Sequence, residues 1–285
     1  MGGEPDQPIS RQFSKMMNAF SDMNVLDDQE LDQFRRIVLE PSSNVIKRVS
    51  SYEIEFEIDR KENVNISSKL NSSYLRSLFI TKARNTELVR SYATTASPQI
   101  FISSSVSSQQ SSSKNPLVTH ANMKWHVDGA NDNEKLLTWV YIYFESPEDL
   151  SAKTGGGAVL YSRRPDGIVN TYWRNGHQYG KSSDYCVYYP KHNSSYLFSG
   201  SHTSHAITPT CGEGKRFVVV IWFKMRKNSF ASFAERWALL CCPTAKVVCK
   251  HCFRTFASTQ TYKRHNRLSC KKKPFNKRLV QQHSH

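Results

Sequence analysis

Three residues that lie far apart in the sequence have the types needed to hold one iron ion. His126 and Asp128 form an H-x-D triplet, and His205 follows much later in the chain. Two imidazoles and one carboxylate on one face of an octahedral ion leave three positions open, which suits non-haem Fe(II). Two of these positions can take a 2-oxo acid as a chelate, and the third can take O2. We therefore expect an iron centre that oxidises a C–H bond.

A cation after His205 completes this predicted site. Arg216 directly precedes the apolar run 217–223, which has the length of a buried strand. A guanidinium is always charged and offers two parallel hydrogen bonds, so we expect Arg216 to bind the distal carboxylate of the 2-oxo acid. Lys215 is the alternative for this role, and His202 is the alternative to His205 as an iron ligand. We expect no catalytic residue beyond the three iron ligands.

A second ligand set lies near the C-terminus and differs in its chemistry. Its members are separated by two, twelve and four residues: Cys249, Cys252, His265 and Cys270. Thiolates and an imidazole at this spacing predict tetrahedral Zn(II). The gap of twelve residues is that of a ββα finger, and Phe256 and Tyr262 fall where such a finger keeps its core residues. So small a unit folds only with its metal, at roughly 10–16 kcal/mol of apparent binding free energy.

Strands must position the iron ligands. Residues two apart on a strand point to the same side, so His126 and Asp128 would project together. Aromatic and β-branched runs predict further strands up to Phe223. They are Leu136 to Phe144, Ala158 to Tyr161, Ser195 to Phe198 and Phe217 to Phe223. Short strands separated by Gly, Pro and Asn turns predict a sandwich or a jelly roll.

Helices and one strand are predicted before the iron ligands. Asp27 and Glu30 have the spacing of a capping box, and apolar residues follow at helical spacing until Glu40-Pro41 would end the helix. Residues 52–58 alternate acidic and apolar types as a half-buried strand does, and residues 74–89 are predicted to be helical. Residues 103–115 are a serine-rich stretch of low complexity, which predicts a flexible loop.

On these residues, segment 123–224 resembles the double-stranded β-helix of the 2-oxoglutarate/Fe(II)-dependent dioxygenases, most of all the prolyl 4-hydroxylase group. The matched traits are the H-x-D triplet, Thr138, Gly155-Gly156, Pro190 before a strand ending at Phe198, and H-x-x-x-P followed by a basic residue. The resemblance implies Fe(II) held by His126, Asp128 and His205, with 2-oxoglutarate held by Arg216. It also implies hydroxylation of a protein side chain, a prolyl one, with release of succinate and CO2. Ascorbate would keep the iron ferrous.

The segment departs from the prolyl 4-hydroxylase pattern at two positions. Met123 stands where the group often has a tyrosine that contacts 2-oxoglutarate. The basic residue usually follows the distal histidine by ten positions, which is Lys215 here, whereas Arg216 follows by eleven. Arg216 is preferred because an apolar strand follows it directly. His205 is preferred to His202 because Ala-Ile-Thr-Pro follows it.

Two other functions remain open. The basic tail favours an oxidative demethylase acting on nucleic acid, but that group normally has a second arginine six residues after the first, and here that position is Trp222. The other is a binding protein in which the finger works and the oxygenase fold is vestigial. The finger resembles a C2H2-type finger with its last histidine changed to cysteine. Its helix would present Ser258, Thr261 and Arg264 to bases, while its basic face would suit phosphates or an acidic protein equally.

The charge of the chain is concentrated at its C-terminus. The net charge is +15; residues 224–285 carry 15 Lys and Arg and one acidic residue, whereas residues 1–223 carry 24 and 23. This tail predicts nucleic acid, an acidic protein surface or an import receptor as a partner. No apolar run approaches the ~18 residues of a membrane span, and residues 1–10 lack a secretory signal. We expect a cytoplasmic or nuclear protein with reduced cysteines.

Together these patterns predict an α+β chain with two folded units. Residues 1–22 would be flexible or helical, and residues 23–228 would form the jelly-roll dioxygenase domain with N-terminal supporting helices and the loop 103–115. Residues 245–273 would form the ββα zinc finger, and residues 274–285 would be a basic tail.

Overall fold

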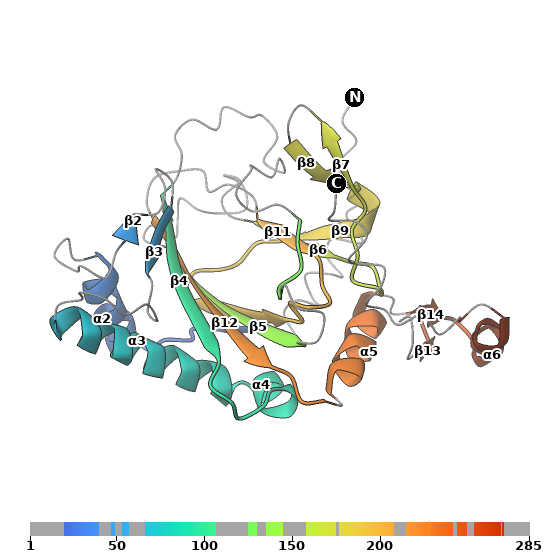
Figure 1. Ribbon diagram of the computed structural model, residues 1–285, viewed down its shortest axis with the longest axis horizontal. Coiled ribbons are helices and arrows are strands. Elements are labelled where there is room, and N and C mark those ends of the chain that lie inside the picture. The colour runs from blue at the N-terminus through green and yellow to red at the C-terminus, as the bar shows by residue number, and fades with distance from the viewer. Residues whose placement is uncertain are drawn as a thin grey trace.

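The computed structural model has a mixed fold of helices and antiparallel sheets (Figure 1). It describes residues 20–39, 47–48, 53–56, 66–106, 125–129, 135–144, 158–174, 177–207, 215–227, 229–241, 244–249, 254–268 and 270. The predicted basic tail lies outside these ranges. Of the predicted N-terminal segment 1–22, only residues 20–22 are described. Ser21 and Asp22 lie in a strand, not in a helix or a flexible stretch.

The larger sheet has seven strands, each antiparallel to its neighbours. In sheet order they are β1 (Ser21–Met23), β10 (Ser194–Phe198), β5 (Leu136–Phe144), β12 (Lys215–Lys224), β4 (Gln99–Val106), β3 (Glu53–Phe56) and β2 (Lys47–Arg48). The aromatic and β-branched runs of β5 and β12 suit its central positions. The strands predicted at 136–144, 195–198 and 217–223 are confirmed.

The smaller sheet has three strands in the order β11 (His205–Ile207), β6 (Val159–Ser162) and β9 (Tyr185–Tyr188), again antiparallel. β6 confirms the strand predicted at 158–161. Between β6 and β9 the chain forms the hairpin of β7 (Thr171–Arg174) and β8 (His177–Gly180), then a 3-10 turn at Ser182–Asp184. Figure 1 shows this hairpin projecting at the top of the molecule.

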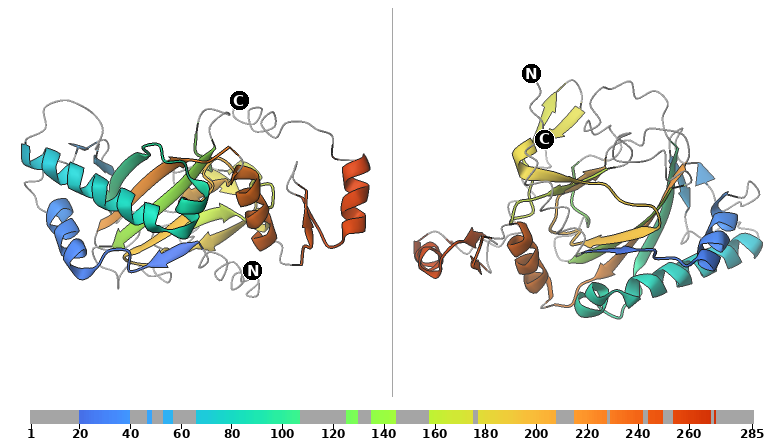
Figure 2. Two further views of the ribbon diagram at one scale, coloured as in Figure 1. Left: turned by 90° about the horizontal axis from the view of Figure 1, so that it is seen from below. Right: turned by 180° about the vertical axis from the view of Figure 1, so that it is seen from behind.

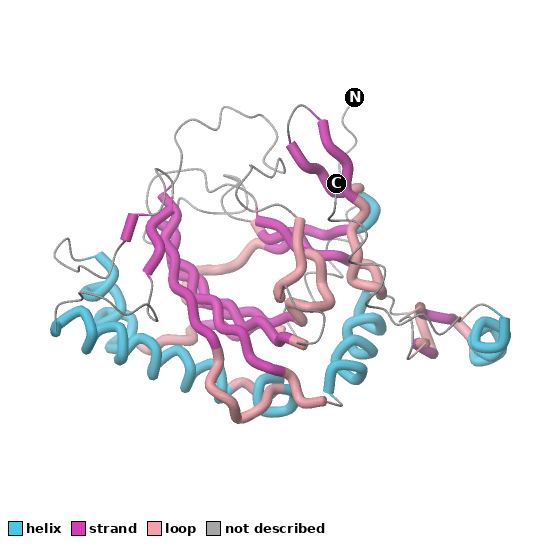
Figure 3. Tube along the Cα trace, in the orientation of Figure 1, coloured by secondary structure: helices cyan, strands magenta, loops and turns pink. Residues whose placement is uncertain are grey.

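From β4 onward the chain passes repeatedly between the two sheets. After β4 it meets the smaller sheet at His126, which forms an isolated bridge with His205. It then returns to the larger sheet as β5, forms β6 and β9 of the smaller one, and alternates as β10, β11 and β12. Figure 3 shows the two sheets facing each other. Residues far apart in sequence therefore meet between the sheets.

Helices cover the outer face of the larger sheet (Figure 2). Phe34 of α2 (Asp28–Leu39) and Phe79 of α3 (Ile66–Asn85) pack on Tyr141 of β5, with ring centroids 5.9 and 4.9 Å away. α4 (Glu87–Tyr92) follows, and α5 (Ser229–Cys241) packs Phe233 and Trp237 on Phe20. Burying each such ring contributes roughly 1.5–3 kcal/mol. In the described part of the chain, no helix has the length and apolar character needed to cross a membrane.

Local signals in the N-terminal part are largely confirmed. The amide of Asp27 donates to Glu30 Oε2, and the amide of Glu30 donates to Asp27 Oδ1, each at 2.9 Å. This is the predicted capping box at the start of α2, and Glu40-Pro41 lies outside the described residues. α3 and α4 confirm the helix predicted at 74–89, although α3 begins earlier, at Ile66. β3 confirms part of the strand predicted at 52–58.

The prediction of a flexible loop at 103–115 is wrong at its start. Residues 103–106 lie in β4, where Ser103, Ser104 and Ser105 pair with both β3 and β12. The remainder, 107–115, lies outside the described residues. Neighbouring strands on both sides satisfy the backbone donors and acceptors of β4, which outweighs the polarity of its serines.

The C-terminal part has the order of elements predicted for the finger. β13 (Val247–Val248) pairs with β14 (Thr255–Phe256), and α6 (Thr259–Leu268) follows. These elements lie beside α5, at the far right in Figure 1.

Candidate metal centre

His126 and His205 are held together by backbone pairing. The amide of His126 donates to the carbonyl of His205 at 3.0 Å, and the amide of His205 donates back at 2.9 Å. Their ring centroids are 4.2 Å apart. His205 begins β11, which pairs with β6, so the smaller sheet fixes the position of both imidazoles. His126 lies in an isolated bridge, and the expectation that His126 to Asp128 form a strand is wrong.

Asp128 nevertheless meets both histidines. Its Oδ1 lies 3.7 Å from His126 Nε2 and 3.6 Å from His205 Nε2. All three potential ligand atoms lie within 4.8 Å of one another. The amide of Asp128 donates to the carbonyl of Gly200 at 2.8 Å, and this bond ties the backbone at Asp128 to the chain just after β10. The structure thus brings together the two imidazoles and the carboxylate that the sequence predicts as one ligand set.

Two residues that the sequence analysis did not assign to the site position this carboxylate. The hydroxyl of Thr138 on β5 donates to Asp128 Oδ2 at 2.6 Å. Gly200 packs so closely against both groups that a Cβ at this position would overlap Asp128 Oδ2 and Thr138 Oγ1. The only sequence signal for Gly200 is a glycine just after a strand, which often marks a close approach.

Replacing Thr138 with valine is expected to weaken metal binding. Valine keeps the shape of the side chain but loses the hydrogen bond to Asp128 Oδ2, and loss of such a supporting bond typically costs 10–100-fold, so we expect roughly that loss in Fe(II) or Mn(II) affinity. Titration of the metal into the purified protein measures it. Thr138→Ser retains the hydroxyl and is the matched control. Equal affinities for the serine and valine variants would show that the bond does not position Asp128.

Burial keeps His205 in the form that binds metals. Its side chain is only 6% exposed, and burial lowers its pKa to about 4. Its ring is therefore neutral at neutral pH, as metal coordination requires. Nδ1 lies 3.0 Å from the carbonyl of Thr203, which fits an Nδ1–H donor and leaves Nε2 toward Asp128.

The structure does not bring His202 into this ligand set. His202 is buried, and burial lowers its pKa to about 4. Its Nε2 lies 3.2 Å from the carbonyl of Pro165, and its ring packs on Phe230 with centroids 5.7 Å apart. These contacts are those of a structural core histidine.

Arg216 lies buried between the sheets without a partner for two of its nitrogens. The residue is 2% exposed, and among the described residues neither Nε nor Nη2 has a hydrogen-bond partner. Burial lowers the pKa of its guanidinium, while the electrostatic influence of Tyr196 and Tyr161 opposes that shift. A buried guanidinium stays charged, so it needs an anion. The arrangement fits a carboxylate ligand at this place.

Tyr161 adds another buried donor to this region. Burial raises the pKa of its hydroxyl well above the ordinary value, and a side-chain hydrogen bond with Tyr196 adds to this rise. It therefore stays a neutral O–H donor. Its ring lies 6.3 Å from that of His205 and 6.1 Å from that of Tyr196.

Other sequence-predicted features lie outside the described residues. These are the side chain of Lys215, together with Met123, Gly155, Gly156 and Pro209. Thr138 and Pro190 are described and buried.

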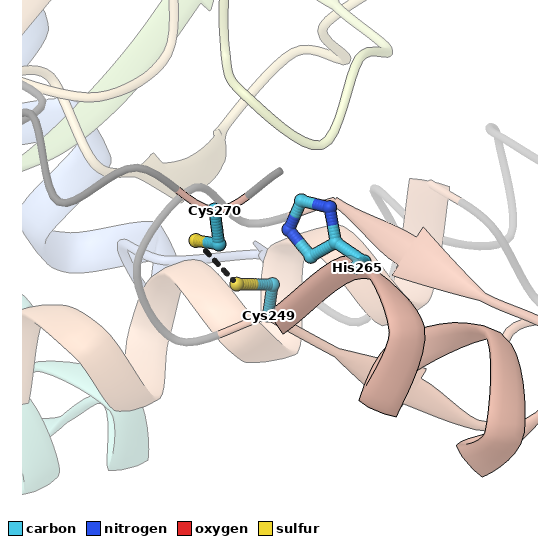
Figure 4. A group of neighbouring side chains, drawn as sticks. All are labelled: Cys249, His265 and Cys270. Atoms are coloured by element: carbon cyan, nitrogen blue, oxygen red, sulfur yellow. Dashed lines mark hydrogen bonds between the residues drawn. The ribbon is translucent and has the colours of Figure 1, made fainter. Parts of the chain in front are cut away.

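Three of the four predicted zinc ligands also meet. Cys249, His265 and Cys270 offer ligand atoms within 4.8 Å of one another, and the two sulfurs are 3.5 Å apart (Figure 4). Cys252 lies outside the described residues. Phe256 packs on His265 and Tyr262, with ring centroids 4.8 and 5.8 Å apart. These are the two positions predicted for the core of the finger.

This C-terminal cluster is packed against the rest of the chain through α5. Val248 forms a buried apolar cluster with Ala234 and Ala238. The same helix buries Trp237 against Tyr161, with ring centroids 6.4 Å apart. α5 therefore contacts the finger elements and the core of the sheets at once.

Comparisons with known proteins bear on the cluster of His126, Asp128 and His205. Residues 116–224, which include His126, Asp128, His205 and Arg216, match the family model described as the 2OG-Fe(II) oxygenase superfamily. Fe(II) and 2-oxoglutarate are the cofactors expected for that superfamily. No curated protein matches the sequence.

Similar solved structures include prolyl hydroxylases. One is a prolyl hydroxylase from Trichoplax adhaerens in complex with a peptide fragment of the hypoxia inducible factor oxygen degradation domain. It matches with a TM-score of 0.45 and 13% sequence identity, over 78% of this chain and 94% of that chain. Another is a prolyl 4-hydroxylase from Phytophthora capsici, which matches with a TM-score of 0.43 and 13% identity, over 80% of this chain and 68% of that chain. A third is a Pseudomonas putida prolyl-4-hydroxylase, which matches with a TM-score of 0.39 and 10% identity, over 76% of this chain and 99% of that chain.

The part of the chain that carries the cluster of His126, Asp128 and His205 thus matches the 2OG-Fe(II) oxygenase superfamily.

Proposed function

We propose that this protein is an Fe(II)- and 2-oxoglutarate-dependent dioxygenase that hydroxylates a prolyl side chain of a protein. The observation that carries the proposal is the convergence of His126, Asp128 and His205 within 4.8 Å, with Nε and Nη2 of the buried Arg216 lacking a hydrogen-bond partner among the described residues. Two imidazoles and one carboxylate suit Fe(II) with open positions for ligands. The orphaned guanidinium suits the distal carboxylate of 2-oxoglutarate.

Bound iron would supply the activation of O2 that is coupled to conversion of 2-oxoglutarate into succinate and CO2. The side chains of this protein would position the ion and the co-substrate and exclude water. His126, Asp128 and His205 would hold the ion, and Thr138 fixes the carboxylate by its 2.6 Å hydrogen bond. Arg216 would orient the co-substrate by two parallel hydrogen bonds. Tyr161, whose ring lies 6.3 Å from that of His205, lines the same region.

The choice of a prolyl substrate rests on the order of motifs in the chain. The H-x-D triplet, Thr138, Pro190, His205 and the basic residue after it follow one another as in the prolyl 4-hydroxylase group. We also propose that the interleaved sheets form a double-stranded β-helix, because the chain alternates between them from β4 to β12. On this proposal residues 23–228 are the dioxygenase domain, and ascorbate maintains ferrous iron.

Product analysis tests the activity. Purified protein incubated with Fe(II), 2-oxoglutarate, O2 and ascorbate is expected to form succinate, faster when a protein substrate is present. Mass spectrometry of candidate proteins is expected to show the gain of one oxygen atom on proline. Turnover with a methylated nucleic acid alone would favour an oxidative demethylase. Absence of succinate under every condition, with metal bound, would favour a vestigial fold.

We propose further that residues 245–273 form a zinc finger with Cys249, Cys252, His265 and Cys270 as ligands. The close approach of the three described ligands supports this, as does the packing of Phe256 on His265. The exposed side chains of Lys263 and Arg264 on α6 would meet nucleic acid or an acidic protein, in the cytoplasm or the nucleus.

Zinc content tests the finger. The wild-type protein is expected to hold one zinc ion per chain by elemental analysis, and His265→Ala to hold none, because three remaining ligands leave the ion weakly bound. Cys252→Ser should behave as His265→Ala does, with iron content retained in both. Asn266→Ala, an exposed neighbour on α6, is the control and should keep its zinc. Zinc retained in both ligand variants would refute the assignment.

A further inference from the structure

The hairpin of β7 and β8 is fixed to the segment that carries the first iron ligand. Trp125 directly precedes His126, and its amide donates to Gln178 Oε1 at 3.2 Å. The ring of Trp125 packs over Gly180, where a Cβ would come within 2.7 Å of it, and lies 5.2 Å from the ring of Tyr185. The amide of Lys181 donates to the carbonyl of Asn170 at 2.8 Å and closes the base of the hairpin. The hairpin therefore stands at a set place beside the metal centre.

Both faces of this hairpin carry aromatic side chains. Trp173 pairs in register with Gln178, so it lies on the face that contacts Trp125. Tyr172 pairs with Tyr179 on the opposite face, with ring centroids 5.6 Å apart and nearly parallel. Tyr172 is 52% exposed and Trp173 is 59% exposed. Tyrosine and tryptophan side chains are enriched where proteins bind partners.

The charge around the hairpin is positive. Residues 163–184 include four Lys and Arg and two Asp. Both carboxylates are taken up by Arg164, at 2.6 Å for Asp166 and 3.4 Å for Asp184. Lys181, directly after β8, is exposed and forms no ion pair with any described residue. The surplus is small compared with the many phosphate contacts that nucleic acid binding normally uses, and it suits an acidic peptide.

We propose that the β7–β8 hairpin is the docking surface for an extended, acidic segment of the protein substrate. Trp173, on the face nearer the metal centre, packs on an apolar or proline side chain of that segment. Lys181 binds a carboxylate of that segment. The term substrate rests on the proposed dioxygenase function, but the docking itself requires only the hairpin.

Peptide binding tests the proposal without turnover. The probes are fluorescein-labelled peptides of repeated Glu-Ala-Pro-Leu or Lys-Ala-Pro-Leu units, and a labelled single-stranded DNA. Fluorescence anisotropy with the full-length protein is expected to show binding of the acidic peptide, weakened by salt. Trp173→Ala is expected to weaken it by roughly 10-fold or more, as loss of an aromatic anchor does. Trp173→Gln, which places a polar side chain at the same surface position, should lower the peptide affinity by the same factor.

Controls separate the outcomes. Leu239→Ala changes an exposed apolar residue of α5 and Lys227→Glu an exposed cation after β12; neither should change peptide affinity, whereas Lys181→Glu should lower it. The rise in melting temperature on adding Mn(II) and 2-oxoglutarate reports the folded metal centre in every variant. Equal binding of both peptides, preference for DNA, or unchanged affinity in both Trp173 variants would overturn the docking surface. If the wild type shows no Mn(II) response but binds the acidic peptide, the dioxygenase proposal fails and the docking surface stands.

Discussion

Asp128→Ala is expected to abolish iron binding and succinate formation. In the described part of the chain, Asp128 is the only carboxylate in the cluster with His126 and His205. Without it two imidazoles remain, which do not balance the charge of Fe(II) or complete one face of the ion. The variant also leaves the hydroxyl of Thr138 without its 2.6 Å acceptor. Activity should fall by at least about 1000-fold, to the level without enzyme, since the metal provides the whole reaction.

Metal analysis and a succinate assay on the same preparation measure this effect. Asp32→Ala is the matched control, because Asp32 is an exposed carboxylate on α2 and should leave both readouts unchanged. The melting temperature without metal should be similar for the two variants, which separates loss of the ligand from loss of the fold. An Asp128→Ala protein that retains turnover would remove Asp128 from the site.

Arg216→Met is expected to have opposite effects on co-substrate binding and on stability. The affinity for 2-oxoglutarate should fall by roughly 100-fold, because charge-assisted hydrogen bonds of a buried guanidinium are worth about 1.5–3 kcal/mol and more when paired. The free energy of unfolding without ligand should rise by about 1 kcal/mol or more, because a buried charge without a partner is replaced by an apolar side chain of similar length. If Arg216 merely held the fold together, its substitution would lower the free energy of unfolding instead.

Two measurements check this pair of effects. The concentration of 2-oxoglutarate at half-maximal turnover reports the first, and urea unfolding of the metal-free protein reports the second. Arg90→Met, at an exposed position of α4, is the control for removing a positive charge. Lys215→Met tests the alternative residue. If Lys215→Met and not Arg216→Met raised the requirement for 2-oxoglutarate, the role would move to Lys215.

Local patterns in the sequence determined the types of the ligands and most of the elements. The H-x-D triplet and His205 named the three residues that the structure brings within 4.8 Å. Reciprocal hydrogen bonds between Asp27 and Glu30 are a local property, so their spacing was enough to place the start of α2. The aromatic and β-branched run at 136–144 likewise gave the bounds of β5.

Tertiary contacts decided what local patterns could not express. The serines of β4 are in a strand because β3 and β12 pair with them from both sides. One backbone bridge holds His126 beside His205, and Gly200 packs closely against Asp128, although the segment of His126 and Asp128 is no regular strand. Arg216 Nε and Nη2 lack a hydrogen-bond partner among the described residues because of how the strands around them pack.

The sequence by itself therefore predicted the three residues His126, Asp128 and His205 that the structure brings together, and roughly where the strands run. Only the folded chain decided that Thr138 and Gly200 position the carboxylate, that His202 is structural, and that an aromatic hairpin stands beside the metal centre. The physical reason is range. Capping, periodicity and ligand spacing act over a few residues, whereas burial and pairing depend on residues that folding brings together from distant parts of the chain.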